Sequence, residues 1–259
     1  MKNILKLYNF SIYTYFFISI CFVCGYIKEI FIIMIIIMFH EFGHALASKY
    51  FNYDIISIDI YPFGGITKVN KKINCPIKND IIIYMGGILM QLFLQIIIIC
   101  LFKINIISFS IYKLFILYNK IIIIFNLFII YPLDGFLVMS RVLEKHIPFY
   151  FSKIIMGIIS VIFLALFIFN NDFLFSNLTI TLFLVYQLIF YCYNINNIFN
   201  RFLLERYLYN ISYSKIKYNK KEDIRLLRKE CYHFFSSQRD LISEKEILAK
   251  KFDINQGFW

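Results

Sequence analysis

Long apolar runs separated by short polar stretches dominate this chain. A helix of about 20 apolar residues is long enough to cross the hydrocarbon core of a bilayer. The runs predict about six membrane-spanning helices, over residues 8–27, 30–47, 81–102, 121–138, 147–169 and 173–193. The pattern therefore predicts an all-α polytopic membrane protein.

Two stretches between these runs are harder to assign. Residues 104–119 are apolar, but they are short for a span and Lys113 interrupts them, so they predict an interfacial helix. Residues 50–80 form the most polar interior stretch, and within it apolar and polar residues alternate loosely around Gly64 and Gly65. This alternation predicts a short hairpin or re-entrant loop after the second span.

The composition changes after the last apolar run. Residues 199–259 are polar and mixed in charge, and the stretches 220–236 and 243–252 have helical character. We therefore expect two domains, a transmembrane domain over 1–198 and a small, helical, basic cytosolic tail over 199–259.

Composition and charge narrow the class of protein. Apolar residues make up 60% of the chain, well above the share in soluble domains, which excludes an ordinary soluble enzyme. The net charge of +11 suits a membrane with an anionic cytoplasmic face, and no motif for nucleic acid is present. Lys and Arg gather mostly in alternate loops, which predicts a multi-pass membrane protein with both termini cytoplasmic.

Three ionisable residues, His40, Glu41 and His44, lie inside the apolar run over 30–47. An ionisable group at that depth is costly unless it is paired or faces a protein-lined cavity. His40 and His44 are four residues apart, which places both on one face of a helix, where they can bind one Zn²⁺. Glu41 can then act as general base on a metal-bound water. The pattern predicts a hydrolytic zinc site.

A catalytic zinc usually has three protein ligands, so a third must come from elsewhere. His146 and His233 lie in polar surroundings. Asp134 instead lies in a second apolar run, where Pro132 precedes it and Gly135 follows it and both interrupt the helix. Broken helices at membrane depth are tolerated where they line a cavity. Asn126 is a further buried polar residue on the same run.

These motifs resemble those of the site-2 protease family of intramembrane zinc metalloproteases. His40-Glu41-Phe42-Gly43-His44 is similar to its zinc-binding helix, and Asn126 with Asp134-Gly135 is similar to its second signature. Tyr61-Pro62-Phe63-Gly64-Gly65 resembles a loop of the sporulation branch. The chain departs from the family pattern at Ile129, Phe136 and Met90, the last of which is followed by Gln91.

The resemblance implies roles for several residues. Asp134 would be the third zinc ligand, and Asn126 would hold the substrate strand or stabilise the oxyanion. The loop with Gly64 and Gly65 would lie over the site and pair with an unwound substrate by adding a strand.

The implied function is hydrolysis of a peptide bond in or near the membrane of a membrane-associated protein, with a pro-sigma factor as the substrate in the sporulation branch. The resemblance would also imply inhibitory membrane partners and a location in the bacterial inner membrane. One alternative is a site-2 protease of another branch that cleaves an anti-sigma factor or a signal-peptide remnant. The others are an inactive zinc-binding scaffold, against which the intact Glu41 argues, and a transporter, which would carry polar residues through several spans.

Overall fold

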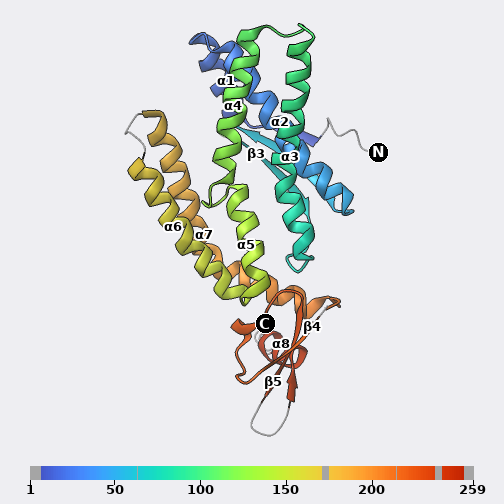
Figure 1. Ribbon diagram of the computed structural model, residues 1–259. Coiled ribbons are helices and arrows are strands. Elements are labelled where there is room, and N and C mark those ends of the chain that lie inside the picture. Colours follow the sequence, from blue (N-terminus) through green and yellow to red (C-terminus); the bar gives the residue numbers. More distant parts are fainter. Residues whose placement is uncertain (1–6, 63, 171–174, 214, 237–240, 254–259) are drawn as a thin grey trace. The chain divides into compact units, whose positions relative to one another are not determined.

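The computed structural model describes residues 7–62, 64–170, 175–213, 215–236 and 241–253 (Figure 1). The chain forms two compact units, one of Met1–Lys71 with Ile82–Phe128 and one of Lys72–Ile81 with Ile129–Trp259. Among the described residues, five helices are long and apolar enough to cross a membrane. They are α2 (Ile27–Tyr50), α3 (Ile77–Lys103), α4 (Phe109–Leu127), α6 (Phe149–Asn170) and α7 (Phe175–Leu208).

The first predicted span, over residues 8–27, is not a single long helix. It consists of strand β1 (Tyr8–Phe10) and the 12-residue helix α1 (Ile12–Val23). Twelve residues span only about 18 Å at 1.5 Å per residue, which is less than the thickness of the hydrocarbon core. The helix begins late because the Ser11 side chain accepts a hydrogen bond from the Thr14 backbone and caps it.

A three-stranded sheet packs against α2 in the first unit. Strands β2 (Asp54–Tyr61) and β3 (Gly64–Asn70) form an antiparallel hairpin, and β1 pairs with β2 in parallel. The predicted hairpin is therefore confirmed. Apolar side chains join the sheet to α2, with the buried cluster formed by Ile37, Ala45, Ile58 and Ile60.

Helices α2 and α3 approach very closely at two glycines. A Cβ atom at Gly43 would lie 2.2 Å from the backbone oxygen of Gly86. Small residues at such a contact allow two membrane helices to pack backbone to backbone. Helix α4 packs on α2 and α3 through the buried residues Ile32, Ile36, Leu94 and Phe115.

The bounds of helix α4 differ from two of the predicted elements. The interfacial helix expected over 104–119 and the start of the span expected over 121–138 form one continuous helix. Lys113 and Lys120 do not break it because both side chains lie on its exposed side. The helix ends at Leu127, residues 128–133 are not helical, and α5 (Asp134–His146) begins after this break.

The tail is not all helical. The stretch 220–236, predicted as a helix, instead holds the short 3₁₀ helix η2 (Ile224–Leu226) and strand β5. Alternate burial along β5 shows why, since His233 and Phe235 face inward between less buried neighbours, the period of a strand. The helix predicted over 243–252 is confirmed. The tail elements are β4 (Lys215–Asn219), β5 (Cys231–Ser236), β6 (Leu241–Ser243) and α8 (Glu244–Asp253).

The tail packs on the end of α7 within the second unit. Helix α7 continues past residue 198 and ends at Leu208, while the division into domains at 198 stays a prediction. Arg206, which is 1% exposed, forms a buried ion pair with Glu244 of α8 and donates to the backbone oxygen of Arg228. An apolar cluster surrounds this contact, with the buried members Phe149, Phe199, Phe202, Leu203, Leu227, Phe235 and Leu248.

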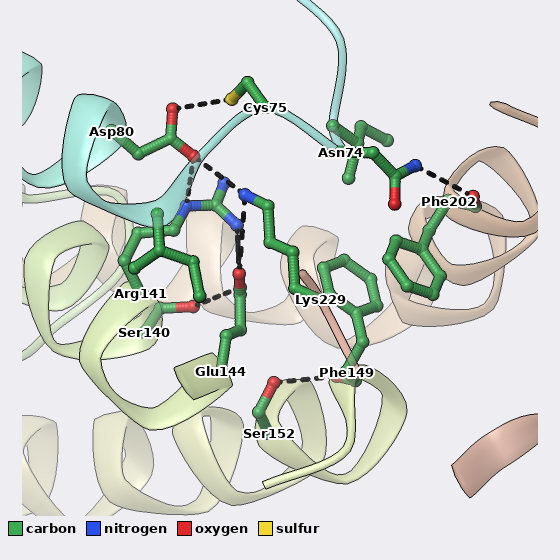
Figure 2. Close-up of polar contacts among 12 residues, drawn as sticks. Asn74, Cys75, Asp80, Ser140, Arg141, Glu144, Phe149, Ser152, Phe202 and Lys229 are labelled. Carbon is green, nitrogen blue, oxygen red and sulfur yellow. Dashed lines mark hydrogen bonds and ion pairs between the residues drawn. The ribbon is translucent and has the colours of Figure 1, made fainter. Parts of the chain in front are cut away.

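A second buried cluster in this unit consists of charged residues (Figure 2). Asp80, in the first turns of α3, lies 2.9 Å from Nε of Arg141 and 3.1 Å from Nζ of Lys229. Glu144 forms ion pairs with Arg141 at 2.6 Å and with Lys153. We call this group of five residues the Glu144 cluster. It joins α3, α5, α6 and the tail, and it brings together two acidic and three basic side chains.

Candidate metal centre

Helix α2 brings the His-Glu-His motif together in a buried position. His40, Glu41 and His44 are 5%, 4% and 8% exposed. The two imidazole rings meet edge to face with their centroids 4.7 Å apart, and their Nε2 atoms are 3.0 Å apart. Ligand atoms of all three residues lie within 4.8 Å of one another. The cluster is therefore compact enough to hold one metal ion.

Each of the two imidazoles is held through the nitrogen that faces away from the other ring. Nδ1 of His44 donates to the backbone oxygen of Ile83 at 2.7 Å, and Nδ1 of His40 donates to Oε1 of Gln91 at 3.0 Å. Carbonyl oxygens only accept, so each Nδ1 carries a ring proton, and in the neutral form of each ring Nε2 presents a lone pair. The two Nε2 atoms are 3.0 Å apart, and two lone pairs at that distance do not hydrogen bond to each other. The arrangement fits two neutral imidazoles that share one cation.

Gly87 of α3 leaves room for that cation. A Cβ atom at this position would lie 2.5 Å from Cε1 of His40 and 2.6 Å from Nε2 of His44. Any side chain here would press on the ligand atoms themselves. The donor set of two neutral imidazoles beside a carboxylate is one that Zn²⁺ accepts, so the residues fit the ion that the motif predicts.

Strand β3 covers Glu41. A Cβ atom at Gly65 would lie 2.3 Å from Cγ of Glu41, so only glycine allows the strand to approach this closely. Two residues further along, the Thr67 hydroxyl donates to Oε2 of Glu41 at 2.7 Å. The hairpin thus fixes one oxygen of the carboxylate.

Tyr8 of β1 lies near the same carboxylate. Its hydroxyl donates to the backbone oxygen of Met38 at 2.9 Å. Burial, and then the negative charge of Glu41, raise the pKa of Tyr8 to about 12. The tyrosine is therefore protonated at neutral pH and acts as a fixed donor beside α2.

The other residues predicted for the site lie on elements other than α2. Asp134 is the first residue of α5, in the second unit, and it is 8% exposed. Asn126 is half-buried near the end of α4, in the first unit. Gly64 begins β3 with φ of +148°, a conformation that favours glycine. Phe63 of the same loop lies outside the described residues. The roles predicted for these residues stay predictions.

Four residues that contact the motif or its partners had no role predicted from the sequence. Gly87, Thr67 and Gln91 contact the motif directly, and Asn119 contacts Gln91. The sequence contains features that indicate some of these contacts. Paired glycines in an apolar helix indicate close approach, and amides in such a helix need partners, but the partners come from other elements.

Comparisons with known proteins find matches for part of this chain. Residues 28–109 match the model of "Peptidase family M50". The chain is 31% identical over 125 residues to "Stage IV sporulation protein FB" of Bacillus subtilis (strain 168), a match that covers 48% of this chain and 43% of that protein. The matched stretch thus spans less than half of that relative's length.

The fold also has a counterpart among solved structures. It is similar to the "Site-2 Protease from Methanocaldococcus jannaschii" with a TM-score of 0.50 and 20% identity, over 73% of this chain and 89% of that chain. The predicted resemblance to the site-2 proteases is confirmed. Together with the five long apolar helices, it identifies the chain as an integral membrane protein. The family match includes α2, the hairpin and α3, and it ends before Asn126 and Asp134.

Proposed function

We propose that the chain is an intramembrane zinc metalloprotease that hydrolyses a peptide bond in or near the membrane. One observation carries the proposal, which is the convergence of the His40 and His44 Nε2 atoms beside Glu41 within an apolar helix. Burying three ionisable groups at such a position is costly, and a metal-dependent reaction accounts for that cost.

The residues have distinct roles in this proposal. His40 and His44 hold one zinc ion per chain through their Nε2 atoms. Bound zinc supplies a Lewis acid and lowers the pKa of a water molecule. Glu41 takes the proton from the attacking water and later delivers it to the leaving amine. Thr67 holds Oε2 of Glu41 and thereby sets the orientation of the carboxylate.

We assign Asp134 as the third zinc ligand. Asp134 is buried and directly follows the break between α4 and α5, and broken helices at membrane depth line cavities, which supports this role. Asn126, at the end of α4, is then a donor to the substrate backbone or to the oxyanion. Both assignments follow the second signature of the family that the chain resembles.

The hairpin offers a way to bind an extended substrate. Strand β3 is an outer strand of the described sheet, whose order is β1-β2-β3, and it passes over Glu41 at Gly65. A substrate strand that pairs along β3 would place its carbonyls near the general base. Helical substrates must unwind first, because a helix uses its carbonyls in its own hydrogen bonds.

The proposed substrate is a membrane-associated protein, and specifically a pro-sigma factor during sporulation. The similarity to a sporulation protein supports this choice. A site-2 protease of another branch, acting on an anti-sigma factor or a signal-peptide remnant, is the alternative. We further propose regulation by inhibitory membrane partners, as the resemblance implies.

The proposed location is the inner membrane of a bacterium, with the tail in the cytoplasm. Five crossings place the two ends of a chain on opposite sides of the membrane. Two cytoplasmic ends therefore require that α1 also enters the membrane, and its 12 residues would need a thinned bilayer to cross it.

A co-expression experiment tests the function. The chain, its Glu41→Gln variant and a tagged pro-sigma factor from the same genome are expressed in a heterologous bacterium, and the tag is followed on a blot. We expect a shortened product with the wild type and none with Glu41→Gln, because the variant keeps the shape of the side chain but is not a base. Glu29→Gln, on the first turn of the same helix, is the matched control and should cleave normally.

Zinc content of the purified proteins completes the test. Wild type and Glu41→Gln should each contain about one zinc ion per chain, whereas Asp134→Ala should contain less, since a ligand is lost. Equal cleavage by Glu41→Gln would remove the general base. Full zinc content in Asp134→Ala would move the third ligand elsewhere. Cleavage of a tagged anti-sigma factor but not of the pro-sigma factor would support the alternative branch.

A further inference from the structure

A chain of side-chain amides leads from His40 across two further helices. Oε1 of Gln91 accepts from Nδ1 of His40 at 3.0 Å, and Nε2 of Gln91 donates to Oδ1 of Asn119 at 3.4 Å. Nδ2 of Asn119 in turn donates to Oε1 of Gln95 at 3.1 Å. We call Gln91, Asn119 and Gln95 the amide chain. It joins α2, α3 and α4 within one compact unit.

These amides are unexpected where they lie. Gln91 and Asn119 are fully buried, and their helices are apolar enough to cross a membrane. Their neighbours Leu94 and Phe115 belong to the apolar cluster that joins the three helices. Packing alone would be served by apolar residues of the same size, without the cost of removing amides from water. The amide chain therefore needs an explanation other than packing.

The direction of the hydrogen bonds explains why the amides are present. Gln95 accepts from the nitrogen of Asn119, which turns the oxygen of Asn119 towards the nitrogen of Gln91. The oxygen of Gln91 is thereby turned towards His40. Each amide is held in one orientation by the next, and the last link keeps the proton of His40 on Nδ1. The Nε2 lone pair of His40 then faces Nε2 of His44.

We propose that Gln91 is a positioning residue of the metal centre, held in place by Asn119 and Gln95, and that it fixes the tautomer and ring orientation of His40 for zinc binding. This inference rests on the proposed zinc site. Groups that accept a hydrogen bond from a ligand histidine set its orientation and tune the affinity of the metal. In an apolar helix an amide does this without the cost of a second buried carboxylate.

The two ligand histidines differ in how they can be perturbed. His44 is held by the backbone oxygen of Ile83, which no side-chain substitution removes. His40 depends on the Gln91 side chain. Substitution of the amide chain should therefore weaken one ligand and leave the other in place, which predicts a partial loss of zinc affinity.

The test measures zinc affinity of the full chain in detergent by competition with a chromophoric chelator, and the visible absorption of the Co²⁺-loaded protein. Gln91→Leu should bind zinc about 10- to 100-fold more weakly and change the Co²⁺ bands. Asn119→Leu should give a smaller loss, because Gln91 keeps its bond to His40 but loses its own anchor. Gln187→Leu, which removes an amide from the apolar helix α7, is the matched control and should bind zinc like the wild type.

Gln91→Glu separates positioning from packing. A carboxylate still accepts from Nδ1 of His40 and raises the basicity of the ring, and it is anchored again when the amides of Asn119 and Gln95 turn over so that Asn119 donates to it. Zinc affinity should therefore return to at least the wild-type value. Equal weakening in Gln91→Glu and Gln91→Leu would reduce the role of Gln91 to packing and overturn the inference. Wild-type zinc affinity in Gln91→Leu would overturn it as well. Thermal unfolding in the same detergent shows whether each variant is folded.

If Gln91→Leu does not fold, Asn119→Leu tests the inference in its place. Zinc affinity and Co²⁺ bands like those of the wild type in Asn119→Leu would then overturn the proposed role of the amide chain. The outcome also distinguishes the two proposals. A wild-type protein that binds no zinc would remove the proposed function together with this inference. A wild-type protein that binds zinc as tightly as Gln91→Leu does would remove only the inference.

Discussion

Two buried polar groups in this chain meet the same physical problem in opposite ways. The partners of His40 in the amide chain are uncharged, and every link is a neutral hydrogen bond. The Glu144 cluster in the other unit consists of five charged side chains that form ion pairs with one another. Figure 2 labels Asp80, Arg141, Glu144 and Lys229 of this cluster. Both groups avoid unpaired polar atoms in an apolar setting, but only one of them leaves room for a cation to be added.

The difference follows from what each group must do. A zinc site receives two positive charges when the ion binds, so neutral imidazoles held by neutral amides present lone pairs without competing cations. The Glu144 cluster already contains its cations, and its charges join segments that are far apart in the sequence. We therefore expect substitutions in the first group to alter metal binding and substitutions in the second to alter stability.

The largest effect should come from Gly87→Ala. The new methyl group would lie within 2.7 Å of ligand-ring atoms of both histidines, and neither ring can move without losing its Nδ1 bond. We expect loss of zinc from the purified protein and no cleavage in the co-expression experiment, with the fold retained. Zinc content by atomic emission is the measurement.

Gly157→Ala is the matched control for that substitution. Gly157 also lies in an apolar helix, but the nearest atoms to its added Cβ, in Tyr191 and Cys192, are 3.6 and 3.9 Å away, which is ordinary contact. This variant should keep its zinc and its activity. A Gly87→Ala protein with full zinc content would show that the ion does not lie beside Gly87.

The sequence was sufficient for those features that depend on local spacing. His40 and His44 are one helical turn apart wherever a helix forms, so their shared face could be predicted from numbering alone. The hairpin was likewise visible in the alternation that surrounds Gly64 and Gly65. The apolar run around residues 30–47 then placed the motif in a buried helix, as the structure confirms.

Features that depend on distant partners were not predicted. Asn119 is one polar residue in a run that was hard to assign from the sequence. Its contact with Gln91 forms only when α4 packs beside α3. Residues 220–236 were predicted to be helical, yet pairing with β4 makes part of that stretch a strand. The contact between Lys229 and Asp80 appears only in the folded chain, because the two residues are far apart in the sequence.

A smaller effect should follow from Glu144→Gln. Burial opposes the charge of Glu144, but the three cations around it outweigh burial and lower its pKa to about 2. Removing the charge leaves those cations with Asp80 alone, which should destabilise the protein by about 3–5 kcal/mol, the cost of breaking a buried ion pair. The measurement is the midpoint of thermal unfolding in detergent.

Glu222→Gln provides the comparison for that variant, because Glu222 is an exposed carboxylate of the tail. It should leave the unfolding midpoint unchanged. The sign of the pH effect can be checked in the wild type. A lowered pKa means that the stability from Glu144 is present above the pKa of the unfolded state, near 4.5, and disappears as the pH falls towards 2. An unfolding midpoint for Glu144→Gln equal to that of the wild type would show that the cluster does not stabilise the fold.

The smallest effect concerns His233, a buried histidine of β5 in the tail. Burial, and then the positive charges of Arg206, Lys217 and Arg228, lower its pKa from 6.5 to about 4. Between these values the unfolded tail binds a proton that the folded tail does not, so stability falls as the pH drops, by up to about 3 kcal/mol.

Limited proteolysis of the full chain at pH 7.5 and pH 5 should show faster cleavage of the tail at the lower pH. His233→Phe should remove most of that difference, whereas His146→Gln, at an exposed position, should keep it. Equal pH dependence in His233→Phe and the wild type would assign the acid sensitivity to other groups, with the carboxylates of the Glu144 cluster as the next to test.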